Sequence, residues 1–127
     1  PAGPFAVQAA IASFHAAASD AASTDWAAIV RWYDALMQIE PWPIVALNRA
    51  VAIAERDGEA AGLMIVDQLL ASGELKSYHL AHAARADLLR RLGQVNEARV
   101  AYGRALELAT AEPDKRFLAR RLRELLP

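Results

Sequence analysis

The chain contains no cysteine, which excludes a disulfide framework, a thiolate metal site and a cysteine nucleophile. Glycine and proline are scarce, with six of each in 127 residues, and most of them stand where helices are expected to end. No apolar run reaches the ~20 residues that span a bilayer. The opening segment PAGPFAVQAA also lacks the basic start of an export signal. We therefore expect a cytoplasmic protein without a membrane segment.

Motifs of catalysis are missing as well. The sequence has no glycine-rich phosphate loop, no G-x-S-x-G and no H-E-x-x-H. Its aspartates and glutamates are scattered without a pair suited to acid–base chemistry. We therefore expect no catalytic residue, no cofactor and no enzymatic activity.

The net charge of −1 hides an uneven distribution. Residues 1–77 carry a net charge of −5, whereas residues 78–127 carry +4. This difference predicts an electrostatic polarity along the molecule. A surplus of +4 is far below what a dedicated nucleic-acid binder carries, so we expect no direct contact with nucleic acid.

Apolar residues at helical spacing predict an all-α fold. They make up 55% of the chain, and many are alanine, the best helix former. Valine, isoleucine and aromatic residues never alternate with polar ones, so strands are not expected. Glycines, prolines and capping residues divide the chain into seven expected helices, over residues 4–18, 25–39, 43–56, 59–71, 77–92, 95–109 and 114–126.

Details of these helices can be predicted from single residues. Ser77 is expected to cap the fifth helix, and the stretch 112–114 (Glu-Pro-Asp) is expected to break the chain before the last one. Thr24 or Asp25 is expected to cap the second helix. Helical spacing places Val51 and Phe117 among the core residues.

A repeat of about 34–35 residues is clearest in the third pair of helices. Ala86 and Ala98 lie 12 residues apart, where two helices of a hairpin must touch and only small side chains fit. Tyr102 follows Ala98 by four residues, and Ala105 follows Tyr102 by three. Gly93 ends the first helix of the pair. This spacing is typical of tetratricopeptide repeats.

The first pair of helices keeps Trp26 and Tyr33 at repeat spacing. One hairpin cannot bury its own apolar face, and about three are needed for a stable stack. The sequence therefore predicts a tetratricopeptide-like, right-handed stack of three helical hairpins, over residues 4–41, 43–73 and 77–110, with a C-terminal capping helix at 114–126. We interpret residues 1–127 as a single domain that is either cut from a longer protein or processed, because the chain begins with Pro1 rather than methionine.

Two runs, W-P-I-V-A-L-N-R-A-V-A and H-A-A-R-A-D-L-L-R-R-L-G, carry a resemblance to a known family. The chain resembles the C-terminal tetratricopeptide-like extension of a group of bacterial extracytoplasmic-function (ECF) RNA polymerase sigma factors. The resemblance covers nearly the whole chain. Trp42 departs from the smaller residue usual between the two neighbouring prolines.

The resemblance implies a regulatory role in transcription initiation. The extension would act on sigma regions two and four of its own chain, and through them on RNA polymerase. It would control or support sigma activity in place of a separate anti-sigma factor. Small YCII-related proteins, whose genes often neighbour this group, become candidate partners. The alternative is a general peptide-binding tetratricopeptide scaffold that has no link to transcription.

Candidate partner-binding residues lie on the first helix of the second hairpin. Asn48 and Arg49 interrupt an otherwise apolar run there. One interpretation is a clamp on the backbone or carboxylate of a partner, for which arginine offers bidentate geometry. The other is an internal polar bridge, because buried polar groups are usually satisfied within the protein. The sequence leaves both open.

His79, His82 and Arg85 are expected near one face of the fifth helix, as further candidates for the concave surface. Two histidines three residues apart could hold a metal. No third ligand follows at suitable spacing, and His15 is distant in sequence. We therefore expect no metal site and favour a structural or surface-lining role for the histidines.

Two further groups are candidates for surface contacts. Trp32 and Trp42 are expected to be partly exposed, where aromatic residues often anchor a partner. Packing between hairpins is the alternative for both. The arginines of the last helix could pair with an acidic surface or with phosphate, although most charged runs are only solvated faces.

Overall fold

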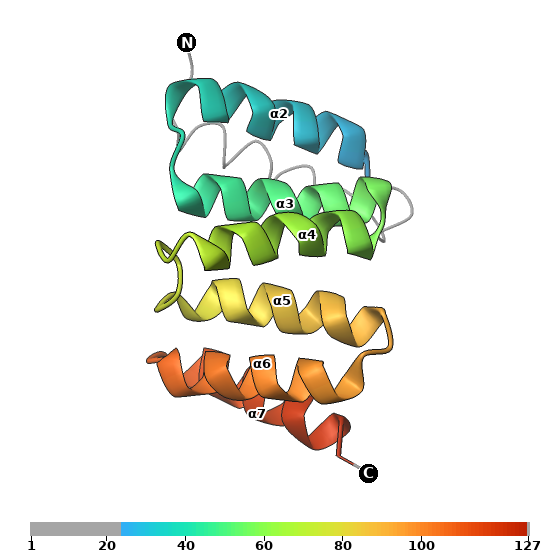
Figure 1. The fold of residues 1–127 in the computed structure, drawn as a ribbon, viewed down its shortest axis with the longest axis vertical. Coiled ribbons are helices and arrows are strands. Elements are labelled where there is room, and N and C mark those ends of the chain that lie inside the picture. Colours follow the sequence, from blue (N-terminus) through green and yellow to red (C-terminus); the bar gives the residue numbers. More distant parts are fainter. Residues whose placement is uncertain (1–23, 127) are drawn as a thin grey trace.

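The computed structural model describes residues 24–126, and in this range the chain forms six α-helices and no strand (Figure 1). The expected helix at 4–18 lies outside the described residues. No helix within 24–126 is long and apolar enough to cross a bilayer. The helices are α2 (Trp26–Ile39), α3 (Pro43–Asp57), α4 (Glu59–Ala71), α5 (His79–Arg91), α6 (Val95–Leu108) and α7 (Glu112–Glu124).

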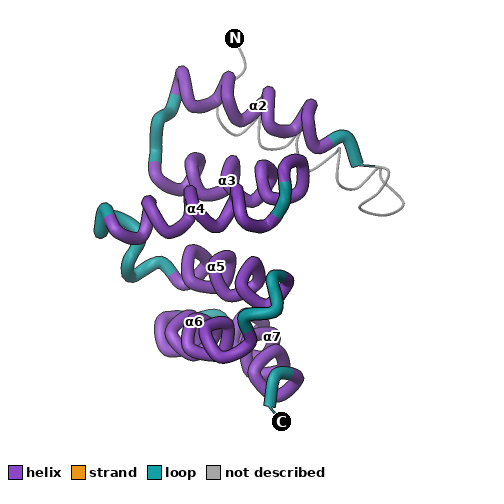
Figure 2. Tube along the Cα trace, turned by 45° about the vertical axis from the view of Figure 1, so that its right-hand side comes forward, coloured by secondary structure: helices purple, strands orange, loops and turns teal. Residues whose placement is uncertain are grey.

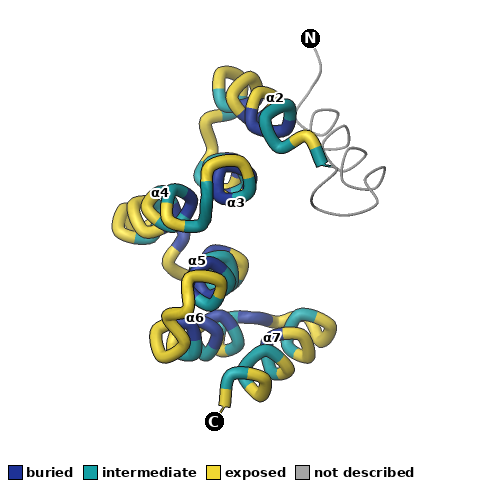
Figure 3. Tube along the Cα trace, turned by 90° about the vertical axis from the view of Figure 1, so that its right-hand side faces the viewer, coloured by how far each residue is buried: buried dark blue, intermediate teal, exposed yellow. Residues whose placement is uncertain are grey.

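Consecutive helices are antiparallel neighbours joined by short loops (Figures 1 and 2). Helices α3 and α4 form one hairpin, α5 and α6 form the next, and α2 and α7 pack on either side of them. Figure 3 shows that the stack follows an arc, with α4 and α6 on its outer side. The first helices of the hairpins, α3 and α5, also touch each other directly. This is the predicted architecture of stacked helical hairpins.

Small residues form the crossing points of the hairpins. Ala86, Ala98 and Ala105 are fully buried, and they share a core cluster with Tyr102, which is also buried. Ala50 takes the same role in the preceding hairpin, where it is fully buried as well. The predicted repeat spacing is confirmed, because small side chains here let the helices approach closely.

The hydroxyl of Tyr102 ties the two helices of its hairpin together. It accepts a hydrogen bond from Arg90 Nε at 3.3 Å and donates one to Asp87 Oδ1 at 3.4 Å. Arg90 and Asp87 are themselves joined at 2.6 Å. Burial raises the pKa of Tyr102 above its usual value. The polar end of this core tyrosine is thus satisfied by α5.

Helix ends follow local chemistry where the sequence provides it. The side chain of Asp25 accepts a hydrogen bond from the backbone N–H of Ala28, which confirms the predicted cap of α2. Gly58 and Gly93 follow the helices α3 and α5 with φ angles of 107° and 81°. A side chain is strained in this left-handed region, so glycine suits both positions.

Two predicted helix starts were wrong. Helix α5 begins at His79, and its N-cap is Tyr78 rather than Ser77, without a side-chain hydrogen bond. Helix α7 begins at Glu112, so that the segment expected to break the chain is instead its first turn. Pro113 is tolerated there because the first helical N–H groups have no partner within the helix. Glu112 adds a negative charge that favours a helix N-terminus.

Three residues differ from their expected exposure. Val51 is 38% exposed and Phe117 is 41% exposed, although both were expected in the core. Arg121 was expected to face water but is only 29% exposed and lies over the Phe117 ring, 5.2 Å from its centroid. The aromatic ring is thus covered by a cation at the surface rather than by apolar side chains.

The glycines of α4 and α6 allow a matched test of this packing. A Cβ atom at Gly62 would collide with the Cβ of Ala54 and lie 2.8 Å from the carbonyl oxygen of Ala50. At Gly103 a Cβ atom would meet nothing within 4 Å. We expect Gly62→Ala to lower the free energy of unfolding by about 1–3 kcal/mol. Gly103→Ala is expected to raise it by up to about 1 kcal/mol. Urea titrations of both variants would check this, and equal effects would contradict the close approach of α3 and α4.

Candidate interaction surface

An ion pair recurs at the two junctions between neighbouring hairpins in the described chain. Arg49 on α3 donates from Nε to Asp34 Oδ1 on α2 at 2.6 Å. Arg85 on α5 makes the same contact to Asp67 on α4 at 2.8 Å. Arg49 and Arg85 thus both reach back from the first helix of a hairpin to the second helix of the preceding one.

The pairs occupy equivalent positions in the repeat. Both arginines directly precede the buried alanine of their helix, Ala50 or Ala86. Both aspartates directly follow a buried core residue of theirs, Tyr33 or Val66. The contact therefore belongs to the repeat itself, and it is the internal polar bridge that the sequence left as an alternative for Arg49. A partner contact at Arg49 or Arg85 would have to compete with this bond.

The third junction, between α6 and α7, lacks the acid of this pair. The residue after buried Tyr102 is Gly103, so α6 has no aspartate at the position that Asp34 and Asp67 hold in α2 and α4. Here α5 and α7 are instead connected through His79, whose Nε2 lies 3.1 Å from Asp114 Oδ2. The last helix is thus attached to the stack by a different set of contacts.

The histidines of α5 have structural partners. Besides the contact of His79 with Asp114, His82 donates from Nε2 to the carbonyl oxygen of Lys76 at 2.7 Å. Within residues 24–126, no three His, Cys, Asp or Glu side chains are grouped closely enough to hold a metal. His15 lies outside the described residues. The predicted partner contacts at His79 and His82 would therefore require these internal bonds to open.

Helix α3 presents a stripe of residues that the neighbouring helices leave accessible. Ile44, Asn48, Val51 and Glu55 are spaced by four, three and four residues, so they share one helix face. Ile44 is 44% exposed, and Asn48 is partly exposed. Asn48 also helps to line a hollow of about 230 Å³ between α2 and α3, together with Trp26, Ile29, Tyr33, Val51 and Ala52.

Helix α5 carries the matching stripe beside it. Leu80, Asp87 and Arg91 are spaced by seven and four residues, and Leu80 is 45% exposed. Arg91 Nη1 lies 2.8 Å from Glu55 Oε1, so the ends of the two stripes meet. We call these residues of α3 and α5 the inner face, which comprises Ile44, Asn48, Val51, Glu55, Leu80, Asp87 and Arg91.

Charges on the inner face are largely paired among themselves. Arg91 contacts Glu59 Oε1 at 2.9 Å and Asp87 Oδ2 at 3.7 Å, in addition to Glu55. The pKa of Glu59 lies below its usual value. The larger cause is a hydrogen bond from the backbone N–H of Glu59 itself, and the charge of Arg91 adds to it. This network gathers at the C-terminal ends of α3 and α5. The other end of the inner face is left apolar, with Ile44, Val51 and Leu80.

The apolar members of this face were not predicted as binding residues from the sequence. Ile44 and Leu80 were not among the candidates, and Val51 was assigned to the core. The spacing of Ile44, Val51 and Glu55 on one helix face was present in the sequence and could have suggested them. Exposure, however, depends on how α3 and α5 pack, which spacing alone does not determine.

The tryptophans occupy three different settings. Trp26 is half-buried against the cluster between α2 and α3, as expected for a repeat residue. Trp32 on α2 and Trp42, which caps α3, are 38% and 56% exposed. The structure thus leaves both available at the surface, and their role as anchors stays a prediction.

Comparisons with known proteins agree with the helical-repeat fold. No protein-family profile matches the chain. It is 43% identical over 124 residues to an uncharacterized protein of Rhizobium meliloti (strain 1021), a match that covers 97% of this chain and 29% of that protein. The chain thus spans less than a third of the length of this relative. It is also similar to the NMR structure of the first tetratricopeptide-repeat (TPR) domain of human RPAP3, with a TM-score of 0.70 at 22% identity over 97% of this chain and 91% of that one.

The recurring ion pair should stabilise the junctions only slightly. Asp34 is 52% exposed, so water screens its bond to Arg49. A double-mutant cycle with Arg49→Ala and Asp34→Ala is expected to give a coupling energy of about 0.2–1 kcal/mol in chemical denaturation. The cycle of Arg49 with Asp67, which do not touch, serves as a control and should give no coupling. Zero coupling between Arg49 and Asp34 at low salt would contradict the internal bridge.

Proposed function

We propose that this chain is an interaction domain that binds a protein segment on its inner face and has no catalytic role. The observation that carries the proposal is the apolar stripe of Ile44, Val51 and Leu80 across two adjacent first helices. Water-exposed apolar side chains that line up across elements are typical of binding surfaces. The charges beside them are paired internally, so an incoming segment need not supply a counter-charge.

The chemistry of this face favours an apolar or amphipathic segment. The ion pairs of Arg91 close one end of the stripe, and Asn48 stands in the middle as a group that can bond a peptide backbone. Such a segment would place apolar side chains over Val51 and Leu80 and leave its polar side toward water. Trp32 and Trp42 would add contacts at the neighbouring edge, on α2 and at the start of α3.

We further propose that the domain belongs to an ECF sigma factor and regulates transcription initiation in the cytoplasm. The support is the resemblance in W-P-I-V-A-L-N-R-A-V-A and H-A-A-R-A-D-L-L-R-R-L-G. The Rhizobium relative is consistent with it, because this chain corresponds to only 29% of that longer protein. The bound segment would then come from sigma region two or four of the same chain, with RNA polymerase engaged indirectly. A YCII-related protein is a second candidate partner.

The alternative is a general peptide-binding tetratricopeptide scaffold. The inner face supports it equally, because the apolar stripe does not itself specify a partner from transcription. The two functions differ in what should precede this domain in its reading frame.

The sigma assignment can be tested from that reading frame and by binding in trans. We expect sequences typical of sigma regions two and four upstream of Pro1. When these regions are produced separately, they should bind the 127-residue chain in isothermal titration calorimetry. A reading frame without such regions would remove the sigma assignment and leave the general scaffold.

The inner face can be tested with charged substitutions at exposed positions, which should leave the fold intact. Val51→Glu and Leu80→Glu are each expected to weaken binding of the partner segment at least about tenfold, because a carboxylate would be buried against apolar side chains. Val100→Glu on α6, where the valine is 74% exposed, is the matched control and should bind like the parent chain. Unchanged binding by both inner-face variants, with circular dichroism confirming the fold, would exclude this face as the site.

A further inference from the structure

Helix α7 is placed like the first helix of another hairpin. Leu118 and Leu122 pack against the core cluster of α5 and α6. In α5, Ala84 and Leu88 have the same four-residue spacing, stand 34 residues earlier and pack against the cluster that includes α3 and α4. Both helices thus use the same positions to pack on the preceding hairpin.

The opposite side of these helices differs in what covers it. In α5, Ala86 and Leu89 are buried against α6, in one cluster with Ala98 and Tyr102. The positions of α7 that lie 34 residues later are Arg120 and Arg123. Within the described chain, no second helix follows to cover them.

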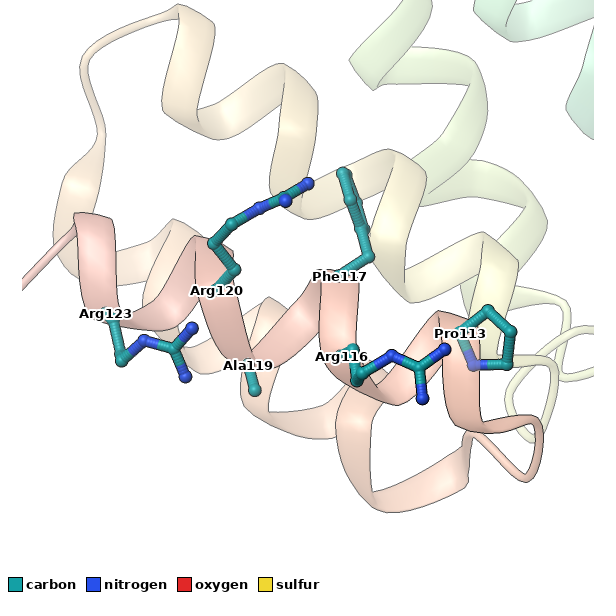
Figure 4. A pocket seen from close by; sticks show the side chains of 6 residues that line it. All are labelled: Pro113, Arg116, Phe117, Ala119, Arg120 and Arg123. Carbon is teal, nitrogen blue, oxygen red and sulfur yellow. The ribbon is translucent and has the colours of Figure 1, made fainter.

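Three arginines therefore share the uncovered side of α7. Arg116, Arg120 and Arg123 are spaced by four and three residues, and they surround a hollow of about 570 Å³ on the helix surface (Figure 4). Pro113, Phe117 and Ala119 complete its lining, so no carboxylate belongs to it. Figure 4 shows the side chains of Arg116 and Arg123 on either side of Ala119.

The charges of this side are poorly neutralised from within. Among residues 24–126, no ion pair involves Arg116 or Arg123, and Arg120 reaches Glu124 only at 3.9 Å. The other arginines of α5 and α7 that contact acids, such as Arg85, Arg91 and Arg121, do so at 3.0 Å or less. The uncovered side of α7 is thus a basic surface, and it corresponds to the side of α5 on which α6 packs.

We propose that this side of α7 binds an amphipathic helix with an acidic border, supplied by a partner protein, in the place that α6 takes beside α5. Ala119 leaves room for a helix to approach between Arg116 and Arg123, whose guanidinium groups would pair with acids on its two sides. The partly exposed ring of Phe117 offers an apolar contact at one edge. This surface lies on a different helix from the inner face and does not depend on the function proposed for that face.

A designed peptide tests this proposal on the full 127-residue chain. It is helical, repeats the small–aromatic–small spacing of Ala98, Tyr102 and Ala105, carries glutamates at the flanking positions and bears a fluorescent label. The control peptide has lysines at the same flanking positions. In fluorescence anisotropy at 50 mM salt, the glutamate peptide should bind at least about tenfold more tightly than the lysine peptide. Added salt should weaken its binding.

Matched variants locate the contact. The triple variant Arg116→Glu, Arg120→Glu, Arg123→Glu should bind the glutamate peptide at least about tenfold more weakly, as expected for three exposed charge pairs. The triple glutamine variant should lie in between. Arg104→Glu on α6 is the control for net charge, and Leu80→Glu is the control for the inner face. Both should bind like the parent chain.

Other outcomes would overturn the proposal. One is a glutamate peptide that does not bind at millimolar concentration, or that binds the folded triple variant equally well, which would make α7 a solvated cap. Binding of a short DNA duplex, lost in the triple variant while the peptide fails to bind, would make the face a phosphate site. Arginine-dependent self-association in sedimentation equilibrium, without peptide, would make a second copy the occupant.

Discussion

Close contact between helices at small residues is the constraint on which the rest of this structure depends. Gly62 lies so near Ala50 and Ala54 that no side chain fits between α3 and α4. Ala86 and Ala98 meet in the same way between α5 and α6. Because the two helices of each hairpin approach closely at these small residues, α3 and α5 also touch each other and present adjacent faces. The inner face is a consequence of that packing rather than of any single residue on it.

Much of the fold could be predicted because each hairpin repeats local chemistry. Asp25 caps its helix and Gly93 ends another, as expected, since both effects depend on a few neighbouring residues. The prediction for Pro113 was wrong because proline suits both a break and a first helical turn, and only the packing of α7 on α6 decides between them. Helix existence was therefore easier to predict than helix starts.

The candidate site was harder to predict, because it depends on contacts between hairpins. Arg49 looked like a polar interruption of a concave surface. The acid to which it donates a hydrogen bond, Asp34, is 15 residues away in sequence and on another helix. Helical spacing assigned Val51 to the core, but the valine is 38% exposed in the stack. Spacing in the sequence shows which residues share one face of a helix. Which other helix, if any, packs on that face depends on the arrangement of the whole stack.

The absence of the recurring arginine–aspartate pair at the last junction affects the order in which the stack opens. In repeat arrays each unit is held by its contacts to neighbouring units, so a unit with fewer such contacts opens more readily. At the junction with α7, Gly103 stands in place of the aspartate. Here α7 is held by Leu118, Leu122, the bond between His79 and Asp114, and a hydrogen bond from Arg99 to the carbonyl oxygen of Leu125. Backbone amides of α7 should consequently exchange with deuterium before those of α5 and α6. A ligand bound to the uncovered side of α7 would slow that exchange, because it would hold α7 in place against the rest of the stack.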